Sequence, residues 1–196
     1  MKIIEPSATL IDTVDAEDIY RKLERCGRVS HLSEPIDAAE FVRKIIRLGH
    51  ESVLEHVSLT FHIICDRAIQ NELVRHRHAS FTVESTRYCK YDEMTIIGRE
   101  EDFISDMHAS IFGTTLPFIA SGYELLLDNG VQPEIARALL PLCLKSELYM
   151  TANLCAWRYI LRLRTSDKAH PQMRFIMNQI LNVFRDKLPV IVEEIS

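Results

Sequence analysis

The chain has 196 residues, 47% of them hydrophobic and 26% charged, which suggests one domain with a proper core. This composition excludes collagen, a disordered tail and a disulfide miniprotein, and no apolar run approaches the ~20 residues of a membrane helix. The net charge of −5 argues against a protein that coats nucleic acid without sequence preference. Five scattered cysteines without a C-x-x-C pair indicate reduced thiols in a cytoplasmic protein.

The first part of the chain carries both strand and helix patterns. β-branched residues flank Pro6, and apolar residues alternate with polar ones from Val57 onward, as in a half-buried strand. Apolar residues at helical spacing predict helices that stop at Gly27 and Gly49. The expected elements are strands over 2–5, 8–14 and 57–65, and helices over 16–26, from 33–35 to 48, and over 67–75.

The second part of the chain is predicted to be irregular up to about Arg99 and helical beyond it. The expected helices cover 101–128, 133–140, 145–165 and 171–187, divided by Asn129-Gly130, Pro141 and a loop over 165–170. Strands early and helices late predict an α+β fold: a single domain over 1–196, with an antiparallel or mixed sheet packed by helices and a helical C-terminal half.

The densest polar stretch covers residues 75–88, at the end of a predicted amphipathic helix. One interpretation is a solvated basic helix end that suits the helix dipole. In the other, a continued helix places Arg75 and His78 on its apolar side, where inward guanidinium groups need a fixed anion such as phosphate. Composition alone therefore suggests a pocket for an anionic ligand.

Two His-Glu pairs invite a zinc interpretation. An H-E-x-x-H motif from His50 would need a histidine at position 54, which is Leu54. An H-x-x-E-H motif ending at His56 would need a histidine at position 52, which is Ser52. Neither motif is complete, so we expect no metal site.

The order of residues in 75–87 carries more information than their composition. It reads R-H-R-x-x-S-x-x-x-x-S-x-R, which resembles the signature of flavin-dependent thymidylate synthases. Further segments resemble the same family, in the same order along the chain: Gly49-His50-Glu51-Ser52, Glu55-His56, Phe61-His62, Ala136-Arg137-Ala138-Leu139-Leu140-Pro141, Leu161-Arg162-Leu163-Arg164 and Ala169-His170-Pro171-Gln172-Met173-Arg174.

The resemblance implies a specific reaction. Members of that family methylate dUMP to dTMP with 5,10-methylenetetrahydrofolate as carbon donor, FAD as redox carrier and NADPH as reductant, without a cysteine nucleophile. They are homotetramers whose active sites are shared between subunits. The acidic net charge and the lack of a membrane-length apolar run predict no nucleic-acid or membrane partner. The alternative is a flavin- or nucleotide-binding protein without synthase activity. A small RNA-binding module is disfavoured by the acidic total and the lack of an aromatic stripe.

The resemblance also implies which residues contact the flavin. The cofactor-binding candidates are His50, Ser52, Arg75, His76, Arg77, Val83, Asn153 and Tyr159. Cationic groups near the ring would stabilise the negative charge of the reduced flavin. The chain departs from the family at Cys155 and Tyr159, where Arg and Asn or His are common.

A second set is implied to bind the substrate. The candidates for dUMP are Glu72, Arg75, Val83, Glu84, Ser85, Thr86, Arg87, Arg137 and Arg164. Arg87 and Arg137 would meet the phosphate. Nothing in the sequence supplies a base beside Ser85, so we interpret it as a binding residue, not a nucleophile. The family often has Gln at the position of Glu72, and Glu or Gln at that of Val83.

Arg164 is the catalytic candidate. In the family the matching arginine lies against the uracil ring, where attack from C5 places negative charge on N3 and its flanking carbonyl oxygens. A fixed guanidinium stabilises that charge as it develops. The competing interpretation is an arginine that satisfies carbonyl groups at a helix end. Trp157, the only tryptophan, is expected in the core or at an interface.

Overall fold

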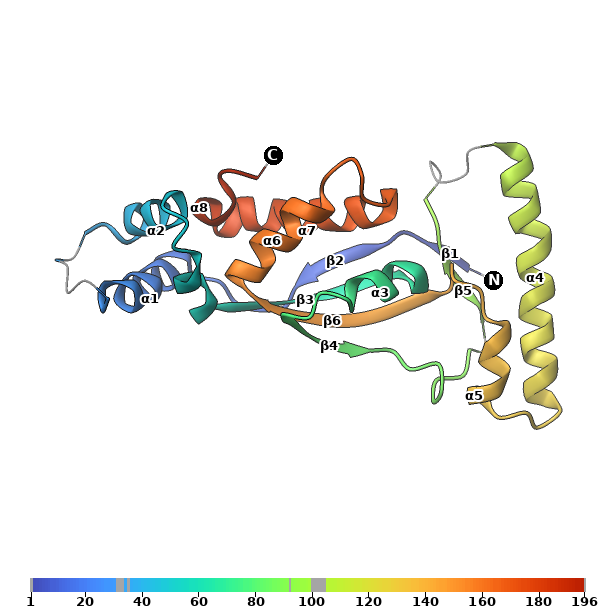
Figure 1. Ribbon diagram of the computed structural model, residues 1–196. Coiled ribbons are helices and arrows are strands. Elements are labelled where there is room, and N and C mark those ends of the chain that lie inside the picture. The colour runs from blue at the N-terminus through green and yellow to red at the C-terminus, as the bar shows by residue number, and fades with distance from the viewer. Residues whose placement is uncertain (1, 31–33, 35, 92, 100–104, 196) are drawn as a thin grey trace. The chain divides into compact units, whose positions relative to one another are not determined.

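The computed structural model describes residues 2–30, 34, 36–91, 93–99 and 105–195 (Figure 1). It confirms the predicted α+β class. The elements are β1 Lys2–Ile4, β2 Ser7–Leu10, α1 Ala16–Arg28, α2 Ala38–Arg47, the 3₁₀ helix η1 Glu51–His56, β3 Ser58–Asp66, α3 Arg67–Leu73, β4 Ala79–Val83, β5 Thr95–Ile97, α4 Asp106–Asp128, α5 Pro133–Ala136, the 3₁₀ helix η3 Arg137–Leu139, β6 Lys145–Asn153, α6 Leu154–Arg164, α7 Pro171–Lys187 and α8 Pro189–Val192.

These elements belong to two compact units. The first unit comprises residues 1–7, 64–73 and 82–148, and the second comprises 8–63, 74–81 and 149–196. In the first unit, β1 and β5 pair in parallel, with Ile3 opposite Ile96. A four-stranded sheet has the order β2-β3-β6-β4. No helix among the described residues is long and apolar enough to cross a membrane.

An aromatic cluster forms the core of the second unit. The Phe61 and Trp157 rings meet edge to face with their centroids 5.1 Å apart, and Phe184 stacks on Phe61 at 6.0 Å. The indole N–H of Trp157 donates to the carbonyl of Leu59 over 3.0 Å. Trp157 is fully buried and is therefore a core residue. Its polar N–H has the hydrogen-bond partner that a buried indole needs.

Local signals explain the helix ends that the sequence predicted. α7 begins with Pro171 at its first position, the His170 side chain accepts from the Gln172 N–H, and its bounds match the prediction. Gly49 adopts a left-handed φ of 73° after α2, as the expected stop requires. Gly27 does not stop α1, which continues to Arg28. A Cβ there would meet the Phe41 ring at 2.6 Å, so close packing explains this glycine.

Several predicted boundaries are wrong. Residues 145–153 form strand β6, not the start of a helix, because Ser146, Leu148, Met150 and Ala152 alternate into the core at a period of two. β4 and β5 lie in the stretch predicted to be irregular. The 133–140 helix is a short α5 followed by η3. The predicted starts of two helices, at 33, 35 and 101–104, lie outside the described residues.

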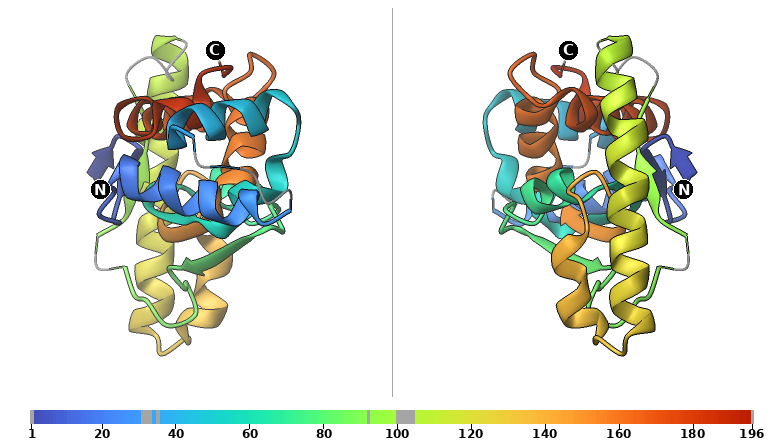
Figure 2. Two further views of the ribbon diagram at one scale, coloured as in Figure 1. Left: turned by 90° about the vertical axis from the view of Figure 1, so that its left-hand side faces the viewer. Right: turned by 90° about the vertical axis from the view of Figure 1, so that its right-hand side faces the viewer.

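The first unit has its own apolar core. Met94, Ile96, Leu116 and Leu144 are buried together. Leu116 comes from α4, which is capped at its start by Ser105, whose hydroxyl accepts from the His108 N–H. The short α5 packs beside α4, as both views of Figure 2 show.

Candidate active site

A cavity of about 750 Å³ opens in the second unit. Its walls come from η1, from the segment after α3 and from one face of α6, where positions three and four apart point the same way. The lining residues are Glu55, Arg75, His76, Arg77, His78, Asn153, Cys155, Ala156, Tyr159, Ile160, Leu163 and Arg164. The cavity therefore gathers six of the predicted site residues: Arg75, His76, Arg77, Asn153, Tyr159 and Arg164.

One hydrogen bond joins two distant motifs in this cavity. The Nε–H of Arg164 donates to Nε2 of His76 over 3.1 Å. Since Nε2 accepts, the imidazole in this arrangement is neutral and carries its proton on Nδ1. The bond fixes the plane of the Arg164 guanidinium at the end of α6.

The lining matches an anionic ligand with an apolar ring. Arg75, Arg77 and Arg164 supply permanent cations. Ile160 and Leu163 supply apolar wall, and Glu55 adds a carboxylate. A flavin dinucleotide presents a flat ring and a pyrophosphate, so the donor set fits this group, and the volume lies in the range of small-ligand sites.

Cys155 lies in the cavity wall as a protonated thiol. Burial raises the pKa of this thiol, and the neighbouring Glu51 and Glu55 carboxylates raise it further, against the opposing charges of Arg158 and Arg162. A thiolate is the reactive form of cysteine. Cys155 is therefore not poised as a nucleophile.

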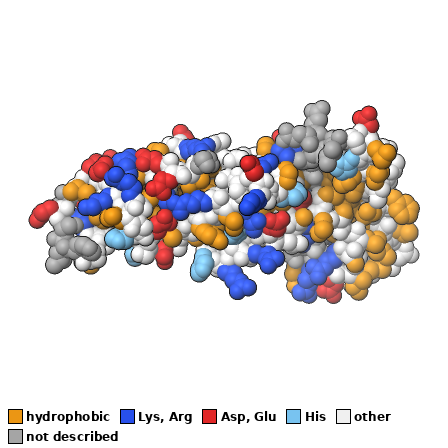
Figure 3. Space-filling view, turned by 45° about the horizontal axis from the view of Figure 1, so that its top comes forward, with side chains coloured by type: hydrophobic (Ala, Val, Ile, Leu, Met, Phe, Trp, Pro, Cys, Tyr) orange, Lys and Arg blue, Asp and Glu red, His pale blue; other side chains and the backbone are white. Residues whose placement is uncertain are grey.

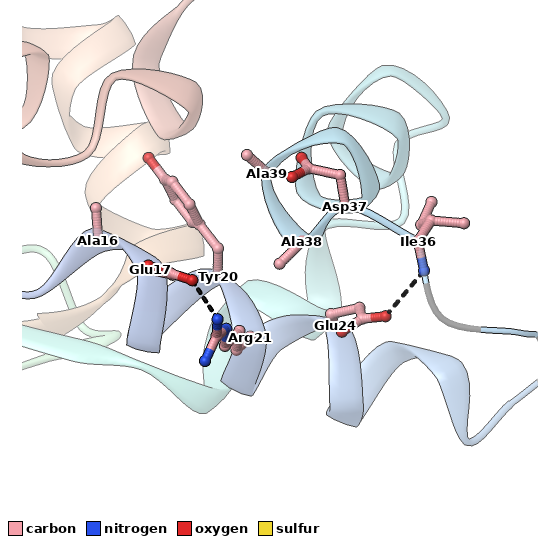
Figure 4. A pocket seen from close by; sticks show the side chains of 9 residues that line it. All are labelled: Ala16, Glu17, Tyr20, Arg21, Glu24, Ile36, Asp37, Ala38 and Ala39. Carbon is pink, nitrogen blue, oxygen red and sulfur yellow. Dashed lines mark hydrogen bonds and ion pairs between the residues drawn. The ribbon is translucent and has the colours of Figure 1, made fainter.

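A second cavity in this unit, of about 480 Å³, has a different chemical character (Figure 4). It lies between α1 and residues 36–39. Glu17 pairs there with Arg21, and Oε1 of Glu24 accepts from the Ile36 N–H over 3.3 Å. Its acidic lining does not suit a phosphate or pyrophosphate, unlike the cation-rich lining of the larger cavity.

The predicted phosphate-binding residues cluster in the first unit. Nη1 of Arg137 donates to Oγ1 of Thr86 over 3.2 Å, and its Nε donates to the Glu134 carbonyl over 3.1 Å. Nη2 of Arg87 lies 3.2 Å from a carboxylate oxygen of Glu134. Oγ of Ser85 accepts from the Arg87 N–H over 3.3 Å. Glu134 of α5 therefore contacts both guanidinium groups: its carboxylate pairs with Arg87, and its main-chain carbonyl accepts from Arg137.

The other predicted residues have varied surroundings. His50 and Ser52 are exposed at the start of η1, and neither is among the described residues that line the larger cavity. Glu72 on α3 and Val83 on β4 are half-buried. α3 ends at Leu73, so the expectation that a continued helix turns Arg75 and His78 to its apolar side is wrong. Both side chains are exposed.

Several lining residues were missed from the sequence. They are Glu55, His78, Cys155, Ala156, Ile160 and Leu163. The last three lie on α6 at three- or four-residue spacing from Asn153, Tyr159 or Arg164, so a helical projection from the predicted residues could have found them. Asn153 also has a structural role, because its Oδ1 accepts from the Ala156 N–H over 2.8 Å and caps α6.

A buried arginine holds α6 in place. Arg158 is fully buried and donates from Nη1 to the Ile191 carbonyl. Its Nη2 lies 3.0 Å from Glu51 and 3.4 Å from Glu194. Arg162 reaches the same two carboxylates, at 3.5 Å and 3.2 Å. This network ties the helix that lines the cavity to η1 and to the C-terminal segment.

The network predicts an acid-dependent stability. Burial alone would raise the pKa of the Glu51 carboxyl, but hydrogen bonds and charges from Arg158 and Arg162 outweigh it and lower that pKa below its ordinary 4.5. A lowered folded-state pKa contributes stability above the ordinary value and loses it as the pH falls through the folded value. Glu51→Gln should cost about 1 kcal/mol near neutral pH, the difference between a charged and a neutral hydrogen bond.

Urea unfolding of both proteins at a series of pH values measures this effect. The difference in free energy of unfolding should shrink below pH 4.5. Glu55→Gln, a nearby exposed carboxyl, serves as the control and should change unfolding little. A Glu51→Gln deficit that stays constant across the acid range would contradict the assigned ion pair.

The chain matches a known protein family. Residues 9–190 match the family described as thymidylate synthase complementing protein. The chain is 33% identical to a probable flavin-dependent thymidylate synthase of Mycobacterium phage L5, over 92% of this chain and 81% of that protein. It is 30% identical to the flavin-dependent thymidylate synthase of Geobacter sulfurreducens, over 85% and 74% of the two chains.

A solved structure agrees with these relatives. The fold is similar to that of PolB, a UMP/dUMP methylase from Streptomyces cacaoi bound with 5-Br dUMP. The TM-score is 0.84 at 25% identity, covering 98% of this chain and 96% of that one. The family match and the fold together define an enzyme of the nucleotide-methylating class. The chain belongs to the flavin-dependent thymidylate synthase family.

Proposed function

We propose that this enzyme converts dUMP to dTMP with 5,10-methylenetetrahydrofolate as carbon donor, FAD as redox carrier and NADPH as reductant. The observation that carries the proposal is the meeting of Arg164 with His76 in a cavity that Arg75 and Arg77 also line. These four residues come from two separate family motifs, and their position in one cavity supports the proposal.

Arg75, His76, Arg77, Asn153 and Tyr159 would hold the flavin in this cavity. The cations balance the pyrophosphate charge, and the apolar wall of α6 accepts a flat ring. When bound, FAD supplies the redox chemistry that carries a hydride from NADPH toward the nucleotide. His50 and Ser52 stay predicted contacts at the exposed start of η1.

Arg87 and Arg137 would bind the phosphate of dUMP. In the structure Arg87 pairs with Glu134, and both side chains are about half exposed (52% and 50%). An exposed pair of this kind contributes only about 0–1 kcal/mol. A phosphate dianion makes stronger charge-assisted hydrogen bonds and can displace the carboxylate. The Ser85 and Thr86 hydroxyls lie beside these cations and add donors, and Glu72 and Val83 complete the predicted substrate contacts.

Arg164 would activate the uracil ring. Its guanidinium, oriented by His76, would stabilise negative charge on N3 and the flanking oxygens of the uracil ring. The ring in this electron-rich form attacks through C5, as the bond between the methylene carbon and the folate nitrogen breaks. This route needs no covalent thiolate. The raised pKa of Cys155, the cysteine in the cavity wall, supports that part of the proposal, since its thiol stays protonated near neutral pH.

We further propose a homotetramer with shared active sites. α4 exposes a row of apolar side chains, and neighbouring elements of the first unit add Ile135, Leu139 and Leu142. The row consists of Met107, Ile111, Phe118 and Leu125, exposed by 74%, 54%, 81% and 64%. Figure 3 shows hydrophobic side chains gathered over α4. A patch of this kind marks an interface, and a second copy offers the same apolar row.

The direct test follows the flavin through both half-reactions. The purified enzyme with FAD should bleach when NADPH is added without oxygen. It should regain its visible absorption, and form dTMP, when dUMP and methylenetetrahydrofolate follow. Omitting either of these two is the control. Flavin binding without dTMP formation would favour the alternative, a binding protein without synthase activity. Absence of flavin binding would contradict both.

A further inference from the structure

We propose that Lys145 is a positioning residue for the segment 84–87, acting through Glu84. The sequence analysis did not single out Lys145, and the proposed reaction does not use it directly. The inference rests on the proposed role of Arg87 and of its neighbours in binding the phosphate of dUMP.

The carboxylate of Glu84 is held on both oxygens. Nζ of Lys145 lies 2.8 Å from Oε2, and the Tyr91 hydroxyl donates to Oε1 over 2.7 Å. The Lys145 and Glu84 side chains are only 20% and 16% exposed. Hydrogen bonds between charged groups are stronger when partly withdrawn from water. The two partners therefore hold the Glu84 carboxylate in one orientation.

The backbone of this residue is anchored as well. The Glu84 N–H donates to the Glu147 carbonyl over 2.8 Å, and the Glu147 carboxylate lies 2.7 Å from the same Lys145 Nζ. Burial alone would lower the pKa of Lys145, but its bonds to Glu147 and Glu84 raise it, so the lysine stays charged. One cation at the start of β6 thus ties two acidic residues together.

The anchor lies directly before the proposed phosphate-binding turn. Next to Glu84, the Ser85 carbonyl accepts from the N–H groups of Tyr88 and Cys89, at 3.2 Å and 2.9 Å. Thr86, only 4% exposed, is bonded to Arg137. A turn fixed at its first residue presents its hydroxyls and cations in one arrangement, and such preorganisation lowers the cost of binding.

The positive charge of Lys145 would also favour binding of the dUMP phosphate. Without it, the Glu84 carboxylate would lose the cation that lies 2.8 Å away, next to a segment proposed to receive a phosphate dianion. Like charges at short range repel and disfavour binding. Lys145 therefore both holds the turn and cancels a charge that opposes the substrate.

The test compares dUMP with deoxyuridine, which lacks the phosphate. Lys145→Met should weaken the calorimetric Kd for dUMP about tenfold, the size of one charge-assisted hydrogen bond. It should raise KM for dUMP with kcat nearly unchanged. Deoxyuridine binding, flavin content and NADPH bleaching should stay at wild-type values. Lys145→Arg should restore most of the dUMP affinity.

Two further variants keep the outcome decisive. Tyr91→Phe removes only a hydroxyl and should weaken dUMP about threefold even if Lys145→Met folds poorly. Lys22→Met removes the charge of an exposed α1 lysine and should leave dUMP binding unchanged. Wild-type Kd for dUMP in both Lys145→Met and Tyr91→Phe, or an equal loss for deoxyuridine, would overturn the positioning role. A wild-type enzyme that binds no dUMP would instead overturn the proposed function together with it.

Discussion

Arg164→Lys is expected to slow the conversion of dUMP by about 10²–10³-fold, while flavin reduction by NADPH changes little. A fixed donor aimed at developing charge typically contributes this much to the rate. The uracil ring takes no part in the reduction of the flavin, so the two half-reactions should separate. Stopped-flow absorbance measures both, one as bleaching and one as recovery with dUMP and methylenetetrahydrofolate.

Geometry explains why lysine cannot replace this arginine. The guanidinium is planar, and its Nε–H is bonded to His76, which sets the direction of the remaining donors. A lysine ammonium has one charged nitrogen, no fixed plane and a tighter hydration shell. The variant keeps the charge of the cavity but loses the oriented pair of donors.

Arg162→Lys is the matched control. Arg162 lies two residues earlier on α6 and pairs with Glu194 and Glu51 instead of lining the larger cavity. This variant should retain wild-type rates in both half-reactions. If Arg164→Lys formed dTMP at the wild-type rate, Arg164 would be a helix-end residue and the activating group would lie elsewhere.

Local signals made much of the fold predictable. α7 matched its predicted bounds because a proline, a capping histidine and a helical period all agree. β6 was missed because strand and helix follow each other without a break. Its period of two ends at Asn153, which caps α6, and no glycine or proline between 145 and 164 marks the change from strand to helix.

The candidate site was predictable where a motif carries it. The segment 75–77 and Arg164 were found because their order along the chain resembles a family, and the structure brings them to one cavity. Lys145 was not found, since Glu84, the residue through which it is proposed to act, is 61 residues away in sequence. Ion pairs across a sheet leave no local spacing to detect.

Phe118→Glu combined with Leu125→Glu is expected to dissociate the proposed tetramer and to remove bound FAD. Both side chains are largely exposed in the single chain. Burying a phenylalanine or leucine at an interface contributes about 1.5–3 kcal/mol, and burying an unpaired carboxylate there is strongly unfavourable. Each interface would therefore lose several kcal/mol per chain, and every ~1.4 kcal/mol weakens association about tenfold.

Sedimentation velocity and flavin absorbance on the same sample test this expectation. The double variant should sediment as smaller species with little bound flavin, because shared sites need neighbouring subunits. Val29→Glu places the same charge at another exposed apolar residue, 74% exposed in the second unit, and should keep the wild-type mass and flavin content. A variant of unchanged mass would show that α4 does not form the interface. A monomer that holds FAD at full occupancy would show that one chain builds the whole flavin site.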